Sequence, residues 1–126
     1  MKKTLTQNEI NLIKNNEWVI IGTCDNNLPR CIVVMPSRVE EKQMIISNIQ
    51  MDKTINNIRN NNNCFINVYL KDEETQIKII GTAKELTDGE LYNEIKKYEE
   101  TNNLPEELNV KSILVIEYQD ITISQE

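Results

Sequence analysis

The 126-residue sequence contains no histidine. Histidine is the usual general acid or base near neutral pH, and it is also the commonest metal ligand among the side chains. Its absence excludes Ser-His-Asp and Cys-His hydrolysis and every metal centre that needs an imidazole. Aromatic residues are scarce as well: they make up 5% of the chain, with one tryptophan and one phenylalanine. A lone Trp18 at the start of a strand-like run is therefore expected in the core rather than stacked on a ligand.

Cysteine is present three times, as Cys24, Cys31 and Cys64. The intervals match no zinc-binding spacing. The segment Met1–Glu9 carries positive charge but has no apolar stretch behind it, so we do not expect a signal peptide. An odd number of cysteines without such a signal predicts reduced thiols in a cytoplasmic protein. Cys24 and Cys31 flank one expected hairpin, where they either approach each other or, as we expect, act as small buried hydrophobic residues.

The sequence has no long apolar run, since no segment approaches the roughly 18 apolar residues that a membrane span needs. The net charge is −6, and an acidic surface repels nucleic-acid phosphates. We therefore expect neither a membrane nor a nucleic acid as partner. The length and a hydrophobic content of 39% predict one globular domain over residues 1–126.

The first half of the chain reads as a helix followed by strands. Thr6 to Glu9 form a capping-box pattern, which predicts a helix over about 6–15. Strand-like runs follow at 18–24, 30–35 and 43–48, and turn residues at 25–29 separate the first two. We expect these three strands to form an antiparallel meander.

The second half alternates helices and strands. A short helix is expected over 52–60 with Asp52 as its cap, and strands over 64–70 and 75–86. Gly81, inside the latter strand, predicts a bulge or a close backbone approach. A second capping-box pattern begins at Thr87, and the spacing of Leu91, Ile95 and Tyr98 predicts a helix over about 88–100. The last strands are expected at 112–118 and 121–124, so the order predicts a single α+β barrel.

Three strings in this order resemble the pyridoxamine 5′-phosphate oxidase-like FMN-binding split-barrel family. The first is the strand 28–34, the second is the strand 44–48 followed by the helix 52–58, and the third is Gln76 to Leu86, which resembles a Gln-x-x-x-x-Gly-x-Ala strand. The resemblance covers about residues 18–124. It implies an α+β fold with a mainly antiparallel, six- to seven-stranded split β-barrel and two or three flanking helices.

The resemblance also implies FMN bound between two identical subunits. The strand 30–35 would lie beside the flavin ring, Ile46 and Ser47 would contact the ring or ribityl chain, and Lys53 would hold the phosphate. Gln76 would reach the flavin from the partner subunit. The cofactor-binding residues implied in this way are Arg30, Ile32, Val33, Val34, Ile46, Ser47, Asn48, Lys53, Thr54 and Gln76.

The chemistry of these side chains fits FMN, although each has an ordinary structural alternative. Lys53, in the first turn of a helix, offers an ammonium group beside the positive end of the helix dipole, or it is a solvated surface lysine. Arg30 suits a phosphate or carbonyl, or lies exposed on its strand. Ser47 and Asn48 either tune the flavin or end a strand. Gln76 matches the pyrimidine edge of a flavin, or is a surface glutamine. We expect Arg59 in a surface ion pair.

Three departures from the family pattern bear on the activity. Met35 stands where pyridoxamine phosphate oxidases have a lysine, and Asp52 stands where their phosphate site has an arginine. The carboxylate of Asp52 repels a phosphate dianion. The C-terminal Arg and His residues that bind substrate in those oxidases are also missing. Oxidation of pyridoxamine phosphate is therefore not expected.

Three functions remain from the sequence. The first is an FMN-dependent oxidoreductase acting on a small molecule that the sequence does not identify, with no catalytic residue assigned. The second is a flavin-binding carrier or sensor without turnover. The third is a cofactor-free dimeric scaffold in which the phosphate site is lost. Haem binding is disfavoured because no histidine is available as an axial ligand, although Cys, Met or Tyr could substitute.

Overall fold

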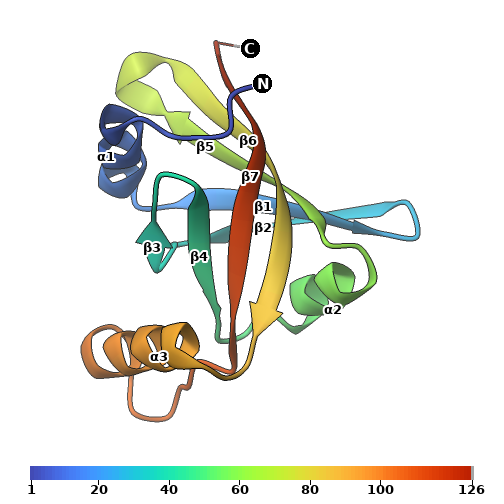
Figure 1. The fold of residues 1–126 in the computed structure, drawn as a ribbon, viewed down its shortest axis with the longest axis vertical. Helices are drawn as coiled ribbons and strands as arrows, with labels where there is room; N and C mark the ends of the chain where they lie inside the picture. The colour runs from blue at the N-terminus through green and yellow to red at the C-terminus, as the bar shows by residue number, and fades with distance from the viewer. Residues whose placement is uncertain (126) are drawn as a thin grey trace.

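The computed structural model describes residues 1–125 and contains one seven-stranded antiparallel sheet. The strand order is β2-β1-β5-β6-β7-β4-β3, and the sheet does not close on itself, so that β2 and β3 form its two edges. This arrangement confirms the α+β split-barrel prediction (Figure 1). The elements are α1 (Gln7–Asn16), β1 (Val19–Asp25), β2 (Leu28–Val34), β3 (Arg38–Val39), β4 (Gln43–Asn48), α2 (Asp52–Asn60), β5 (Asn63–Leu70), the 3₁₀ turn η1 (Lys71–Glu73), β6 (Thr75–Leu86), α3 (Glu90–Asn102) and β7 (Ser112–Ser124).

The capping box at the start of α1 forms as the sequence predicts. The Thr6 hydroxyl accepts the Glu9 N–H at 3.2 Å, and the Glu9 carboxylate accepts the Thr6 N–H at 2.9 Å. Lys2 Nζ donates to both carboxylate oxygens at 2.8 Å. Burial raises the pKa of Glu9, but the hydrogen bonds from Lys2 and Thr6 outweigh it and hold that pKa below its ordinary value.

The other two helices begin without the expected side-chain caps. Met51, rather than Asp52, occupies the cap position of α2, and Asp52 is the first helical residue. Gly89, with φ of 94°, caps α3, so Thr87 forms no capping box. A left-handed residue at that point redirects the chain before a threonine hydroxyl can reach the first turn of the helix.

The expected meander of three strands is wrong. β1 and β2 form a hairpin through Asn26 and Asn27, which both have positive φ as a two-residue hairpin turn requires. β4, however, pairs with β7 and with the short β3 at the opposite edge of the sheet. Both faces of β4 are buried, and a run apolar on both faces carries no sequence signal for which strand will be its neighbour.

The long hairpin of β6 and β7 crosses the centre of the molecule. The two strands expected at 112–118 and 121–124 are one strand, β7, because Gln119 and Asp120 continue it. The register shifts between Ile80 and Gly81, which places the predicted irregularity at Gly81. A Cβ atom on Gly81 would lie 2.7 Å from Ile116 Cγ2 and 2.9 Å from the Glu117 carbonyl oxygen. The glycine is therefore required by a close approach of the two strands.

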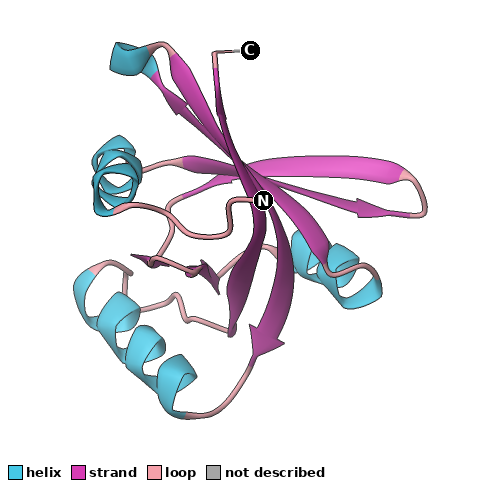
Figure 2. Ribbon diagram, turned by 45° about the horizontal axis from the view of Figure 1, so that its top comes forward, coloured by secondary structure: helices cyan, strands magenta, loops and turns pink. Residues whose placement is uncertain are grey.

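The three helices lie around the curved sheet, as Figure 2 shows. The main hydrophobic core lies inside the barrel and includes residues of α1, α2 and the sheet, among them Ile13, Ile55 and Ile66. A second cluster is formed by Ile45, Ile95, Val110 and Ile113, where α3 packs on the sheet. Leu91 packs against this second cluster as predicted, whereas Tyr98 is exposed.

Candidate anion site at the start of α2

A groove at the N-terminal end of α2 brings together several of the predicted residues. Its volume is about 480 Å³. β2 supplies Arg30 and Ile32 from the face of the strand that turns toward α2, and the first turn of α2 supplies Lys53 and Thr54. The lining residues of this anion groove are Arg30, Ile32, Gln50, Met51, Asp52, Lys53, Thr54 and Lys111.

The start of α2 has no side-chain cap. The first backbone N–H groups of a helix have no partner inside it, so an uncapped start leaves donors that can bind an anion. The segment before it is held by Asn48, whose Oδ1 accepts the Met51 N–H at 3.1 Å and whose carbonyl accepts the Lys111 N–H at 2.8 Å. Asn48 is itself buried and donates to the Ser112 hydroxyl at 3.1 Å. Its side chain thus shapes the approach to α2.

The anion groove contains three cationic side chains and one carboxylate. Arg30, Lys53 and Lys111 supply the positive charges, and Asp52 supplies the negative one. Lys111 Nζ lies 3.3 Å from Asp52 Oδ1. The ion pair offsets the repulsion that Asp52 exerts on an anion. Arg30 and Lys53 form no ion pair with an acid within residues 1–125. On a chain with net charge −6, this groove is a local concentration of positive charge.

The sequence did not point to Lys111. It lies in the segment after α3, far along the chain from α2, and its backbone hydrogen bond to Asn48 and its contact with Asp52 place it at the groove. No local pattern marks a lysine in a loop as a neighbour of a helix that ended 51 residues earlier.

The remaining residues predicted on β2 and β4 fall into different environments. Ile32 and Val34 are partly buried and pack on the main core, whereas Val33 is 62% exposed on the other face of β2. Ile46 is buried in the main core, so its side chain is occupied there. Ser47 is also buried, and its hydroxyl is 2.6 Å from that of Ser37. Thr54 is buried at the back of the anion groove.

Gln76 does not lie with the other predicted site residues. It is the second residue of β6, opposite Tyr69 of β5 and Ser124 of β7. Its Oε1 accepts a hydrogen bond from Asn67 Nδ2 at 2.9 Å. β6 begins at the end of the sheet remote from α2 (Figure 1), so Gln76 and Lys53 of one chain lie at different ends of the sheet.

Arg59 forms the surface ion pair that its position suggested. Its guanidinium donates two hydrogen bonds to the Glu85 carboxylate, at 2.8 and 3.0 Å. The hydrogen bond to Glu85 raises the pKa of Arg59, and the same bond lowers the pKa of Glu85. This pair ties α2 to the end of β6 and does not face the anion groove.

The outward face of β2, β1, β5 and β6 is apolar and exposed. Large side chains stand on it in register, since Val33 lies opposite Ile20, and Phe65 lies opposite Ile80. We call this surface the outer sheet face; its exposed apolar members are Trp18, Ile20, Val33, Met35, Phe65, Tyr69 and Ile80. The expectation of a buried Trp18 is wrong, because this side chain, directly before β1, is 52% exposed.

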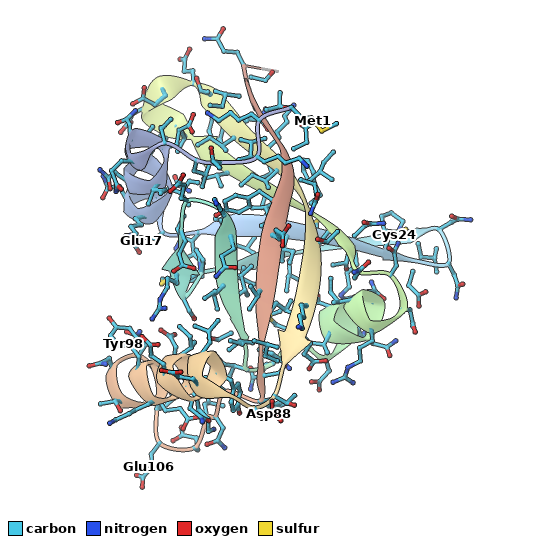
Figure 3. All side chains as sticks on the ribbon, viewed as in Figure 1. Met1, Glu17, Cys24, Asp88, Tyr98 and Glu106 are labelled. Atoms are coloured by element: carbon cyan, nitrogen blue, oxygen red, sulfur yellow. The ribbon has the colours of Figure 1, made fainter. Side chains whose placement is uncertain are left out.

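The cysteines also differ from expectation. Cys31 is exposed and Cys24 is half-buried, whereas only Cys64 is buried. Cys24 and Cys31 line a shallow apolar cavity of about 550 Å³ on the outer sheet face, together with Gly22, Pro29, Phe65 and Ile80. Figure 3 shows Cys24 on the β1–β2 hairpin, which extends past α2. Burial raises the pKa of the Cys64 thiol to about 12, so this cysteine is protonated at neutral pH.

Within residues 1–125, no helix has the length and the apolar character needed to span a membrane. No protein-family model and no curated protein matches the sequence.

Solved structures, in contrast, match over nearly the whole chain. HupZ of Group A Streptococcus is 22% identical, with a TM-score of 0.83 over 97% of this chain and 95% of that one. An FMN-binding protein from Syntrophomonas wolfei is 22% identical, with a TM-score of 0.76 over 90% of this chain and 82% of that one. A Listeria innocua protein whose name relates it to pyridoxamine 5′-phosphate oxidase is 10% identical, with a TM-score of 0.76 over 92% of this chain and 94% of that one.

Identities at this level establish a shared fold and leave the ligand and the activity to be argued from this chain's own residues. The resemblance inferred from the three sequence strings is confirmed in that respect: this chain has the split-barrel fold of the FMN-binding and pyridoxamine 5′-phosphate oxidase-like proteins.

Proposed function

We propose that this chain binds FMN as a homodimer and acts as a flavin-dependent oxidoreductase on a small molecule. The observation that carries the proposal is the uncapped start of α2 surrounded by Arg30, Lys53 and Lys111. The shared fold with an FMN-binding protein supports the same cofactor.

The anion groove matches the charge and the donor needs of a phosphate dianion. Lys53 and Arg30 supply charge-assisted hydrogen bonds, and the first amides of α2 supply backbone donors along the helix dipole. Thr54 and Gln50 add polar groups to the wall. The ion pair with Lys111 partly offsets the negative charge of Asp52, so the repulsion between Asp52 and the phosphate is reduced.

The flavin ring would extend from the phosphate along the inner face of β2. Ile32 lines the groove and Val34 follows it on the same face, which gives a flat apolar strip for a tricyclic ring. Ser47 and Asn48 lie at the end of β4 that leads to the helix. The flavin, when bound, supplies the hydride and electron chemistry, and these residues bind it, orient it and exclude water.

A second copy of the chain completes the site in this proposal. The outer sheet face exposes more large apolar side chains than a monomer normally leaves in contact with water. A two-fold pairing buries both copies of such a face at once. The same pairing would bring Gln76 of the partner subunit to the flavin. Three cysteines that form no disulfide fit a reducing compartment, and we place the dimer in the cytoplasm.

The test compares FMN with riboflavin, which lacks the phosphate, by quenching of flavin fluorescence. Lys53→Ala should weaken FMN binding about tenfold or more, the value of one charge-assisted hydrogen bond, and leave riboflavin binding nearly unchanged. Lys111→Ala should also weaken FMN binding, because it removes a positive charge and leaves Asp52 unpaired. Lys97→Ala, an exposed lysine on α3, is the matched control. Equal affinities of the native chain for FMN and riboflavin would contradict the phosphate assignment.

Turnover separates an oxidoreductase from a carrier. The bound flavin should be reduced by a nicotinamide donor and reoxidised by an acceptor at rates that support repeated cycles. A bound flavin that is reduced by no such donor would leave the carrier or sensor as the function, and a folded chain that binds no flavin would leave the cofactor-free scaffold.

A further inference from the structure

Asn67 is a polar residue set in the apolar outer sheet face. It lies on β5, with Ile20 of β1 opposite it on one side and Lys78 of β6 on the other. Beyond Ile20 stands Val33, and two residues along β5 stands Tyr69. Its amide nitrogen donates to Gln76 Oε1 at 2.9 Å. The fold therefore places two amides in contact on this surface, with Ile20 and Lys78 on either side of Asn67.

The amide oxygen of Asn67 has no hydrogen-bond donor among the described residues, although it is shielded from water. A buried acceptor without a donor costs about 1–3 kcal/mol. Such groups are rare in folded proteins, and each calls for an explanation such as a bound water or a functional role. Asn67 is therefore a candidate for a functional role.

The hydrogen bond from Asn67 fixes the orientation of the Gln76 side-chain amide. Because Oε1 of Gln76 accepts from Asn67, its Nε2 is turned away from Asn67. Exchanging oxygen and nitrogen in both amides would put the Asn67 amide nitrogen in the shielded position, and both of its N–H donors would then lack an acceptor. The arrangement thus presents Gln76 as a donor.

We infer that Asn67 is a positioning residue that holds Gln76 as a hydrogen-bond donor to a carbonyl oxygen of the flavin pyrimidine ring, in a site completed by the second copy of the chain. The inference rests on the proposed function and extends it from the phosphate end of the cofactor to the ring. The carbonyl oxygens of that ring accept hydrogen bonds, so a glutamine held in the opposite orientation would repel them.

Asn67→Leu tests this role because leucine keeps the same branching at Cγ and removes the amide. The variant loses the unsatisfied acceptor, so the melting temperature of the cofactor-free protein should stay the same or rise. FMN affinity should fall about tenfold, because Gln76 is no longer oriented. The visible absorption bands of bound FMN should also shift. Gln76→Glu, which removes the donor directly, should reproduce the weaker binding and the spectral shift.

Two controls separate this inference from the proposed function. Asn93→Leu, an exposed asparagine on α3, should change neither FMN affinity nor spectrum. FMN binding by the native protein with an unchanged affinity and spectrum in Asn67→Leu would overturn the role of Asn67 and leave the proposed function standing. A fall in melting temperature and affinity together, with an unshifted spectrum, would mark a structural role and also overturn it. Absence of FMN binding by the native protein would overturn both.

Discussion

At the residue scale, Asp52 is the carboxylate that opposes anion binding, and Lys111 is the side chain that partly offsets the negative charge of Asp52. Asp52 lies in the first turn of α2, where a carboxylate favours the helix dipole but competes with a bound anion. Their 3.3 Å contact is largely exposed, so water weakens it. The net positive charge of the anion groove therefore depends strongly on the charge of Asp52.

Asp52→Asn should tighten FMN binding several-fold, because it removes the repulsion of the phosphate and frees Lys111 from its ion pair. The measurement is the FMN dissociation constant at low salt, where surface electrostatics are least screened. Asp88→Asn, an exposed change before α3, serves as the control. A weaker affinity in Asp52→Asn would show that the carboxylate takes part in binding.

Glu9 should make the stability of the fold depend on pH in the acid range. Its pKa is lowered in the folded chain from an ordinary value of 4.5. The unfolded chain therefore takes up its proton first, so the stabilisation is complete above pH 4.5 and is lost as pH falls through the lowered folded value. Glu9→Gln should cost about 1 kcal/mol at pH 7 and flatten this part of the curve.

Urea unfolding between pH 3 and pH 7 measures this dependence, with Glu107→Gln, an exposed carboxyl, for comparison. If Glu9→Gln and the native chain lost stability in parallel over this interval, the capping box and the Lys2 contact would not cause the pH dependence of stability.

At the element scale, the positions of the strands and helices in the sequence follow from local patterns, whereas the pairing of the strands does not. The capping box of α1, the two asparagines of the β1–β2 turn and the full extent of β6 were readable because each depends on adjacent residues. The pairing of β4 with β7 depends on residues about 70 positions apart, and β3 is only two residues long. Neither leaves a periodic signal in the sequence.

Gly81→Ala should destabilise the β6–β7 hairpin. The added methyl group would stand 2.7 Å from Ile116 Cγ2 and 2.9 Å from a backbone oxygen that cannot move without disturbing the strand. We expect a loss of about 1–3 kcal/mol in the free energy of unfolding. Gly22→Ala, where the nearest atoms are 3.8 Å away, is the matched control and should cost less. Equal losses in the two variants would show that the close approach at Gly81 is not what requires glycine.

At the scale of the whole molecule, the residues proposed to bind FMN lie at two different ends of one sheet. Arg30, Lys53 and Thr54, predicted from the family resemblance, meet in one groove, whereas Gln76 lies remote from them. Lys111 and Asn67 gave no sequence signal because their roles arise from strand pairing and from a loop that returns to α2. A single chain therefore shows two separate halves of the proposed site.

Val33→Asp should separate the proposed dimer. Val33 is 62% exposed on the edge strand β2 of the outer sheet face, and a two-fold interface through this face would bury two new carboxylates. Sedimentation velocity at micromolar concentration should show a dimer for the native chain and a folded monomer for the variant. Tyr98→Asp, at an exposed hydrophobic residue on α3, should remain dimeric. A native chain that sediments as a monomer would contradict the assembly.

The most direct test of FMN binding at the anion groove is a calorimetric titration of the native chain with FMN, accompanied by a melting curve with and without the cofactor. We expect saturation at one FMN per chain, weaker binding of riboflavin and a higher melting temperature with FMN present. No heat of binding and no change in melting temperature at saturating FMN would contradict it.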